Sequence, residues 1–122
     1  MEEKEKRLSY GGVDIEPEEN RCRFLIKGEL DHHSVKEIRS VIDGYLIDYR
    51  PLSVTLDLGE VTFTDSAGLG LIMGRYARIR DYGGTLDLVH VGEDFMRILR
   101  LAGVERFLTI EGKTKQKKEL PV

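Results

Sequence analysis

The chain has 122 residues, 40% of them hydrophobic and 34% charged, with a formal net charge of -3 at pH 7. This length suits a single domain with its own core, and the near balance of charges gives no reason to expect direct binding to nucleic acid or to an anionic membrane. No apolar run is long enough to cross a bilayer, and residues 1–7 lack the apolar stretch of a signal peptide. Cys22 is the single cysteine, so no disulfide can form within the chain, and we expect a cytoplasmic protein.

The first part of the chain predicts a leader and two strands. Residues 1–12 are charged and then glycine-rich, which is typical of a flexible leader before a domain over 13–110. A short strand is predicted over 13–16, ended by a proline and a polar turn. The alternation over 21–27 predicts a second strand, antiparallel to the first, and a buried core thiol. Its inward positions are Cys22, Phe24 and Ile26.

A loop over 28–33 leads to the clearest helix pattern in the chain. Ser34 begins this helix, because Ser34-Val35-Lys36-Glu37 fits the capping box, in which a serine and a glutamate side chain satisfy free amides at a helix start. Apolar residues at helical spacing continue to Tyr49, and Pro51 prevents any extension into the next strand.

The later strands are polar on one side. The alternation over 52–58 predicts a strand with leucine and valine on one face and serine, threonine and aspartate on the other. The strand predicted over 85–91 repeats this partial one-sidedness. A strand covered by helices on both faces would be apolar on both. We therefore predict helices mainly on one face of the sheet and a fairly polar opposite face, which argues against a doubly wound nucleotide-binding fold.

The stretch after the 52–58 strand places a serine at a helix start. Asp65 and Ser66 are residues of the kind that cap helices, and apolar residues at helical spacing follow until Gly83-Gly84 ends the pattern. The predicted helix therefore runs from Ser66 to about residue 81. Amide donors and the positive end of the helix dipole at such a start favour an anion, phosphate included.

Three glycines interrupt this helix, although each costs on the order of 1 kcal/mol relative to alanine. Gly68 and Gly70 lie in the first turn beside the serine, and we interpret them as leaving room for a partner's backbone. Close packing of the helix on the sheet is the alternative, and packing alone could explain Gly74.

A third helix over 93–102 and a short strand over 107–110 complete the pattern. The order of elements predicts a single α/β domain with a mixed, mostly parallel β-sheet of about five strands. Loops at the carboxyl ends of parallel strands gather at one edge of a sheet. The loops over 28–33 and 59–66 should therefore meet, which places Asp31 near Ser66.

Two chemical alternatives exist for this edge. A hydrolase would need Ser66 with His32 or His33 as its base, but no Gly-x-Ser-x-Gly turn or oxyanion loop surrounds the serine. A metal bound by Asp31, His32 and His33 lacks a cysteine or a third histidine at ligand spacing. No phosphate-binding glycine loop with its lysine is present either. We therefore expect no catalytic residue, no metal and no cofactor.

What the residues support is a switch at Ser66. A kinase that phosphorylates an exposed serine at a helix start adds about -1.5 to -2 charges, which the helix dipole tolerates. A partner fitted to the neutral hydroxyl beside Asp65 would then have to bury an unpaired anion, at several kcal/mol. Thr62 and Thr64 are rival acceptors that precede the cap, where we expect their side chains to support the loop.

Two motifs in the chain match a known pattern. They are Thr64-Asp65-Ser66-Ala67-Gly68-Leu69-Gly70 and Gly28-Glu29-Leu30-Asp31-His32-His33. The first resembles the phosphorylatable Asp-Ser-x-Gly-Leu-Gly loop of the anti-sigma factor antagonists, small single-domain proteins of the STAS fold. The second is similar to the sporulation branch, whose members antagonise the anti-sigma factor that holds the forespore sigma factor. The resemblance spans roughly residues 13–110.

The resemblance implies a phosphorylation-switched binding protein and not an enzyme. The unmodified chain would bind an anti-sigma factor with serine kinase activity and release its sigma factor. That kinase would phosphorylate Ser66, and a metal-dependent serine phosphatase would restore it. We expect a monomer with no direct contact to nucleic acid or membrane. The partner-binding residues that carry over are Asp31, His32, Thr64, Asp65, Ala67, Gly68, Leu69, Gly70 and Met73.

Two points stay open. Within the same fold, the alternative is a regulatory module of another stress-response sigma pathway or of a transporter. Proteins of this family usually end in a further helix, whereas residues 111–122 have little helical amphipathicity. These residues are therefore expected to form a polar tail, either disordered or a short terminal helix.

Overall fold

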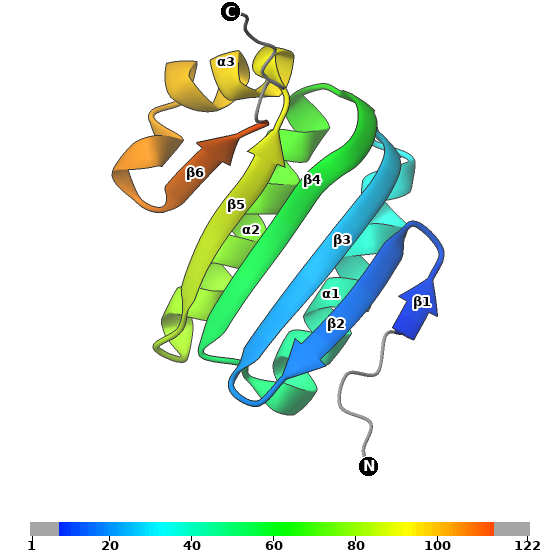
Figure 1. Cartoon of the computed structure of the whole chain (residues 1–122), viewed down its shortest axis with the longest axis vertical. Helices are drawn as coiled ribbons and strands as arrows, with labels where there is room; N and C mark the ends of the chain where they lie inside the picture. Colours follow the sequence, from blue (N-terminus) through cyan, green and yellow to red (C-terminus); the bar gives the residue numbers. More distant parts are fainter. Residues whose placement is uncertain (1–7, 114–122) are drawn as a thin grey trace, which may run out of the picture.

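The computed structural model describes residues 8–113, which contain one six-stranded sheet (Figure 1). The strands lie in sequence order: β1 (Leu8–Tyr10), β2 (Val13–Glu18), β3 (Arg21–Leu30), β4 (Ser53–Thr64), β5 (Thr85–Val91) and β6 (Thr109–Gly112). The pairs β1–β2 and β2–β3 are antiparallel, and the pairs from β3 to β6 are parallel. The predicted mixed, mostly parallel sheet is confirmed, with six strands where about five were expected.

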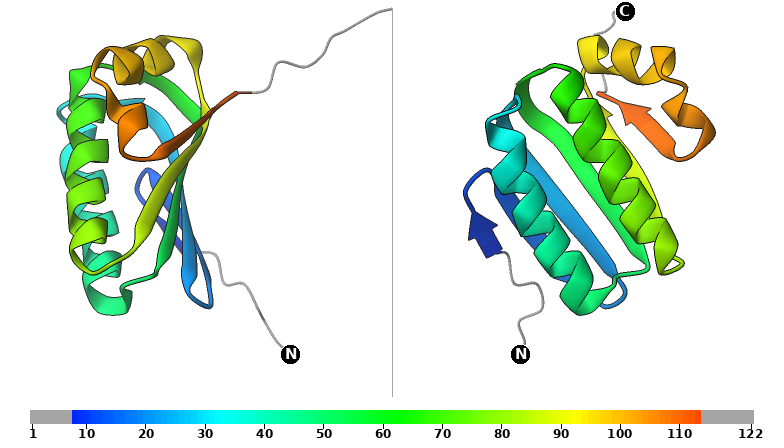
Figure 2. Two further views of the ribbon diagram at one scale, coloured as in Figure 1. Left: turned by 90° about the vertical axis from the view of Figure 1, so that its left-hand side faces the viewer. Right: turned by 180° about the vertical axis from the view of Figure 1, so that it is seen from behind.

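The helices α1 (Ser34–Tyr49) and α2 (Ser66–Asp81) cover one face of this sheet, as the edge-on view of Figure 2 shows. The shorter α3 (Glu93–Leu101) lies at the carboxyl end of β5, and a 3-10 turn at Val104–Arg106 leads from it into β6 (Figure 1). The prediction of helices mainly on one face is confirmed.

The core lies between the sheet and the pair α1 and α2. Phe24 of β3, Leu56 of β4 and Leu88 of β5 are fully buried, and Ile42 and Ile72 face them from the two helices. The predicted core thiol is confirmed as well. Cys22 is buried, and this burial raises the pKa of its thiol to about 12, so the sulfur stays protonated and unreactive at neutral pH.

The opposite face of the sheet is open and polar, as predicted. Cross-strand ion pairs run over it: Arg23 of β3 lies 3.9 Å from Glu16 and 2.5 Å from Asp57, and Lys27 lies 3.1 Å from Asp14. Both aspartates are only 5% exposed. Long basic side chains therefore cover carboxylates on a face that no helix covers.

The start of α1 differs from the prediction. His33 is the N-cap residue and makes no side-chain capping bond, so the predicted capping box at Ser34 is wrong. The Ser34 hydroxyl instead donates to the carbonyl of Glu29 at 2.6 Å, and the carboxylate of Asp31 takes over the cap. The loop before the helix is folded tightly enough for Asp31 to reach the first free amides, which the local pattern did not reveal.

The carboxyl ends of β3 and β4 also differ from the prediction. Residues 28–30 and 59–64, expected in loops, continue the two strands and pair with each other up to Leu30 and Thr64. Register shifts at two points let the ladder pass Gly28, whose φ of +88° is a left-handed conformation that favours glycine. The two strands therefore extend beyond β5 and carry the loops that follow them.

The boundaries of the domain differ slightly from the prediction at both ends. Leu8–Tyr10, expected in a flexible leader, pairs with β2 as β1. The last strand begins at Thr109 instead of residue 107, because the 3-10 turn and the residues after it occupy that stretch. Residues 1–7 of the expected leader and 114–122 of the expected tail lie outside the described residues.

Candidate functional site

The loops after β3 and β4 lie side by side at one edge of the sheet. Leu30 and Thr64 are partners in the β3–β4 ladder, and the N–H of Asp65 donates to the carbonyl of Leu30 at 3.4 Å. The stretch that carries Asp31 therefore begins next to the stretch that carries Ser66, as the topology predicted. Figure 1 shows both helices starting at this edge.

Ser66 is the first residue of α2 and is exposed to solvent. Asp65 is the N-cap, and its Oδ1 accepts from the N–H of Ala67 at 2.8 Å. The carbonyl of Asp65 accepts from the N–H of Gly68 at 2.9 Å, which tightens the first turn. Among residues 8–113, the Ser66 hydroxyl has no hydrogen-bond partner. A free hydroxyl is thus presented at a positively polarised helix end.

Gly68 is explained by packing within the chain. It is buried, and a Cβ added to it would lie 2.1 Å from Thr64 Oγ1 and 3.4 Å from Phe95 Cζ. Thr64 holds this place, with its hydroxyl donating to the carbonyl of Asp65 at 3.2 Å. The prediction that these threonines support the loop is confirmed for Thr64, whereas Thr62 makes no side-chain hydrogen bond within residues 8–113. The interpretation of Gly68 as free space for a partner is wrong.

Gly70 and Gly74 behave differently from Gly68. A Cβ on either would meet nothing within 4 Å, and Gly70 is exposed. Packing on the sheet therefore does not explain Gly74. The neighbouring Leu69 and Met73 are half-buried and pack against the core from the same two turns. The first turns of α2 thus offer a surface with small residues that the fold itself does not require.

The carboxylate of Asp31 stabilises the loop before α1. Its Oδ1 accepts from the N–H groups of His33 and Ser34, both at 2.9 Å. The bond from Ser34 and then the bond from His33 lower the pKa of the Asp31 carboxyl below its ordinary value. This carboxylate orders the loop and leaves the two imidazoles, stacked with ring centres 5.8 Å apart, exposed to solvent. Within the described residues, neither imidazole is hydrogen-bonded to the Ser66 hydroxyl.

A polar cluster on the open face of the sheet was missed at the level of sequence. Asp57 Oδ1 accepts from the N–H of Gly59 at 2.9 Å and lies 3.0 Å from His90 Nδ1, while Oδ2 lies 2.5 Å from Arg23. Burial raises the pKa of Asp57, but the bonds from Gly59, His90 and Arg23 outweigh it, so the pKa lies below its ordinary value. His90 has a φ of +59°, a conformation uncommon for a residue with a side chain. In the sequence, the sign of this cluster was Asp57, one aspartate in a strand of alternating residues.

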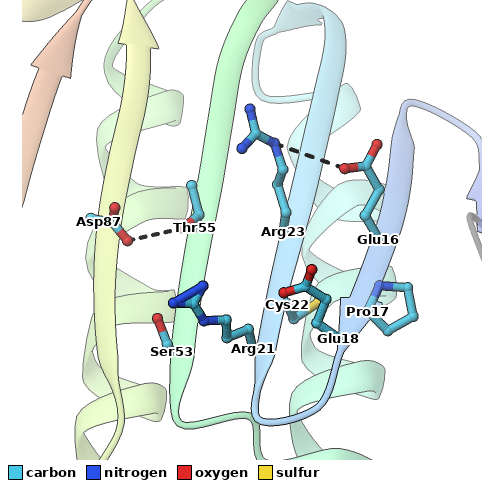
Figure 3. A pocket seen from close by; sticks show the side chains of 9 residues that line it. All are labelled: Glu16, Pro17, Glu18, Arg21, Cys22, Arg23, Ser53, Thr55 and Asp87. Atoms are coloured by element: carbon cyan, nitrogen blue, oxygen red, sulfur yellow. Dashed lines mark hydrogen bonds and ion pairs between the residues drawn. The ribbon is translucent and has the colours of Figure 1, made fainter. Parts of the chain in front are cut away.

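A cavity of about 490 Å³ lies on the same open face, over the amino ends of β3 and β4 (Figure 3). Its lining mixes charges of both signs, and Thr55 bonds Asp87 at 3.0 Å across two strands. It lies at the opposite end of the parallel strands from Ser66. The lining residues are Glu16, Pro17, Glu18, Arg21, Cys22, Arg23, Ser53, Thr55 and Asp87. Three carboxylates against two guanidinium groups do not favour an anion here.

Across residues 8–113, no group of three or more histidine, cysteine, aspartate or glutamate side chains is arranged to hold a metal ion. No helix in that same range has both the length and the apolar character needed to cross a membrane.

A mixed sheet with two long helices on one face, and a free serine hydroxyl where the second helix begins, defines the class of this chain. Residues 13–117 match the family described as the STAS domain, and the chain belongs to that family.

Two relatives and one solved structure are named as anti-sigma factor antagonists. The anti-sigma F factor antagonist of Paenibacillus polymyxa is 32% identical over 100 residues, which cover 80% of this chain and 86% of that protein. The anti-sigma-B factor antagonist of Bacillus subtilis is 28% identical over 102 residues, which cover 84% and 92%. The crystal structure of an anti-sigma factor antagonist from Mycobacterium paratuberculosis has a TM-score of 0.73 at 21% identity, covering 81% of this chain and 83% of that one, which supports the fold.

Proposed function

We propose that this chain is an anti-sigma factor antagonist controlled by phosphorylation of Ser66. The unphosphorylated form binds an anti-sigma factor that is also a serine kinase, and this binding releases the sigma factor. The kinase then phosphorylates Ser66 and ends the association, and a metal-dependent serine phosphatase restores it. The names of the relatives in Paenibacillus polymyxa and Bacillus subtilis support the first part of this proposal. The cycle takes place in the cytoplasm.

One observation carries the proposal: the Ser66 hydroxyl is exposed and without a partner among the described residues, at the first position of α2. A kinase needs a hydroxyl that it can reach without unfolding its substrate. The positive end of the helix dipole favours the product phosphate, while the Ala67 and Gly68 amides stay bonded to Asp65. No other change in the domain is needed for the modification to occur.

The magnitude of the switch follows from the charge. Micromolar binding corresponds to about -8 kcal/mol. Burying a phosphate that finds no cation removes several kcal/mol of this, because the anion loses its hydration. The neighbouring carboxylate of Asp65 adds to the local negative charge and, with its Oδ1 on the Ala67 amide, cannot leave the site without opening the cap. Phosphorylation is therefore expected to lower affinity by orders of magnitude.

The partner surface surrounds Ser66 on both neighbouring loops. Exposed groups at this edge include His32, Asp65 and Gly70. Half-buried Asp31, Thr64, Ala67, Leu69 and Met73 contribute their outer atoms, and Gly68 acts indirectly by letting Thr64 pack. Gly70 is a position where a partner's backbone can approach closely, because nothing lies within 4 Å of the place that a Cβ would occupy.

The test is phosphorylation and binding with purified proteins. The chain is incubated with an anti-sigma kinase and ATP, and mass spectrometry should find one added phosphate on Ser66. Ser66→Ala should bind the kinase and take no phosphate, and Ser66→Asp should bind poorly. Ser40→Ala changes another exposed hydroxyl, on α1, and serves as a matched control that is still phosphorylated. Equal binding by Ser66→Ala and Ser66→Asp would refute the switch.

The match to the Bacillus subtilis protein supports a second candidate, in which the partner belongs to the stress-response pathway of sigma B instead of the sporulation pathway of sigma F. Parallel binding to the anti-sigma F factor of Paenibacillus polymyxa and to the anti-sigma-B factor of Bacillus subtilis separates the two. The partner bound more tightly identifies the branch.

A further inference from the structure

The carboxyl end of β4 has a strand on one side only. β4 pairs with β5 from Ser53 to Asp57 and no further, while β3 accompanies it up to Thr64. Within residues 8–113, the stretch 59–64 therefore has one edge that no strand occupies. Figure 1 shows β4 bending away from the end of β5 at this point. Such an edge presents backbone groups that can pair with another chain.

The separation of β4 from β5 is built into the fold. His90 lies near the end of β5 with a φ of +59°, and after it Val91 pairs with Gly112 of β6. Gly59 lies beside this kink, since a Cβ on it would be 3.3 Å from His90 Cβ. The Asp57 carboxylate joins the N–H of Gly59 and the His90 ring. The cluster on the open face thus fixes the point where the two strands part.

A groove of about 350 Å³ lies between this free edge and the start of α3. We call it the β4–α3 groove. Its floor includes the buried Leu58 and Phe95, and Phe63 stands 52% exposed on its rim. The exposed Glu93 and Asp94 make the facing rim acidic. The lining residues are Leu58, Val61, Thr62, Phe63, Thr64, Gly92, Glu93, Asp94 and Phe95.

We propose that the β4–α3 groove binds an extended segment of the anti-sigma kinase, which adds as a strand along residues 59–64. The segment places an apolar side chain against Phe63 and Phe95, and its lysine or arginine side chains face Glu93 and Asp94. This inference deepens the proposed function and rests on it, since it names how the same partner is recognised.

Backbone pairing and charge both favour this occupant. An added strand satisfies the free edge through main-chain hydrogen bonds, and the groove supplies the side-chain contacts that give specificity. Within the described range Glu93 has no ion-pair partner, and Asp94 has Arg97 at 3.7 Å with both side chains exposed. A basic segment would therefore meet one unpaired and one weakly paired carboxylate, which attracts it and sets its register.

The groove is continuous with the phosphorylation site. Thr64 lines the groove and is two residues from Ser66, and a Cβ on Gly68 would lie 3.4 Å from Phe95. A kinase segment held in the groove would stay within one turn of its target hydroxyl. Docking beside the reacting group raises its effective concentration without any contact to the hydroxyl itself.

The experiment compares variants of the full chain for binding to an anti-sigma kinase, held with a non-hydrolysable ATP analogue so that Ser66 stays unmodified. The kinase probes are the Paenibacillus polymyxa anti-sigma F factor and the Bacillus subtilis anti-sigma-B factor. Phe63→Ala should raise the Kd about 10-fold or more, because it removes the exposed aromatic side chain against which the apolar residue of the segment packs. The double variant Glu93→Lys/Asp94→Lys should weaken binding about 10-fold and abolish its dependence on salt.

Asp48→Lys/Asp81→Lys is the matched control. It makes the same change of charge at exposed positions near the far ends of α1 and α2, and its Kd should stay within about twofold of the unaltered chain. Circular dichroism checks that each variant is folded. Hydrogen exchange followed by mass spectrometry should find amides in 59–64 protected in the complex, as strand addition requires.

The outcomes separate the two proposals. If the unaltered chain binds neither kinase, the proposed function fails and this inference fails with it. If the unaltered chain binds and the groove variants bind as well as the control, or the amides in 59–64 exchange as before, only this inference is overturned. A dimer of the chain that Phe63→Ala dissociates would also overturn it, because the edge would then serve self-association.

Discussion

The three glycines of α2 allow a test that distinguishes packing within the chain from space left free for a partner. Helix propensity alone predicts that each change to alanine stabilises the domain by about 1 kcal/mol. Gly70 and Gly74 have nothing within 4 Å of an added Cβ, so Gly70→Ala and Gly74→Ala should show this gain. Gly68→Ala should not, because its Cβ would lie 2.1 Å from Thr64 Oγ1.

The size of the clash sets the expected difference. Threonine is branched at Cβ and has few alternative rotamers, so Thr64 cannot swing away freely. Overpacking of this kind costs about 1–3 kcal/mol, from which the gain in helix propensity of about 1 kcal/mol is subtracted. Gly68→Ala is therefore expected to lower the free energy of unfolding by up to about 2 kcal/mol, while Gly70→Ala raises it by about 1 kcal/mol.

Urea unfolding followed by far-ultraviolet circular dichroism measures these differences. Thr64→Ala removes the obstructing hydroxyl, so Gly68→Ala introduced into that variant should stabilise it by about 1 kcal/mol. The coupling energy between the two sites should be about 1–3 kcal/mol. If Gly68→Ala has the same effect with and without Thr64, the packing argument for Gly68 is refuted.

Three further predictions concern single side chains. Asp43 lies 2.8 Å from Arg75, which is only 5% exposed, so Asp43→Ala should lower the free energy of unfolding by about 3–5 kcal/mol in urea titrations, because it leaves a buried cation unpaired; a loss below about 1 kcal/mol would contradict this. Asp57 has a lowered pKa, so its stabilising effect is present above the ordinary pKa of about 4 and is lost as pH falls through the lower folded value. Asp57→Asn should therefore be less stable at pH 7 and lose less stability between pH 4 and pH 2, and parallel pH curves for both chains would contradict this. The free energy of unfolding of Ser66→Asp should lie within about 1 kcal/mol of that of the unaltered chain, since a negative charge is favoured at a helix start. A larger loss of stability would mean that the serine is needed for folding.

The long helices were predictable because their signals are local. An apolar stripe at helical spacing and a stop residue are properties of the segment itself, and both α1 and α2 match the prediction at each end. The strand ends were not predictable in this way. Gly28 and Gly59 resemble loop residues in sequence, yet the ladder continues through both because the neighbouring strand pairs across the register shifts.

The residues of the candidate site differ in the same way: some could be predicted from local sequence, and others are brought together only by the fold. Ser66 and its cap could be found because a capping residue and a helical pattern adjoin each other in sequence. Asp57 and His90 could not be associated, since 33 positions separate them and only the parallel pairing of β4 and β5 brings them together. The β4–α3 groove depends in turn on the kink at His90, which no residue preference indicates.

Under the proposed function, the position of Ser66 explains how phosphorylation would act on binding and spare the fold. A phosphate there lies near the Asp65 carboxylate, and two such groups about 6 Å apart in water repel by roughly 1 kcal/mol. The helix dipole offsets about 0.3–1 kcal/mol of this repulsion, so the net effect on the folded chain is close to zero. At an interface, the same phosphate is removed from water, where leaving it unpaired costs several kcal/mol. The cost of burying the phosphate at an interface thus exceeds its effect on the folded chain, and this difference would lower the affinity for a partner. The difference exists only because the hydroxyl is exposed at the first position of α2.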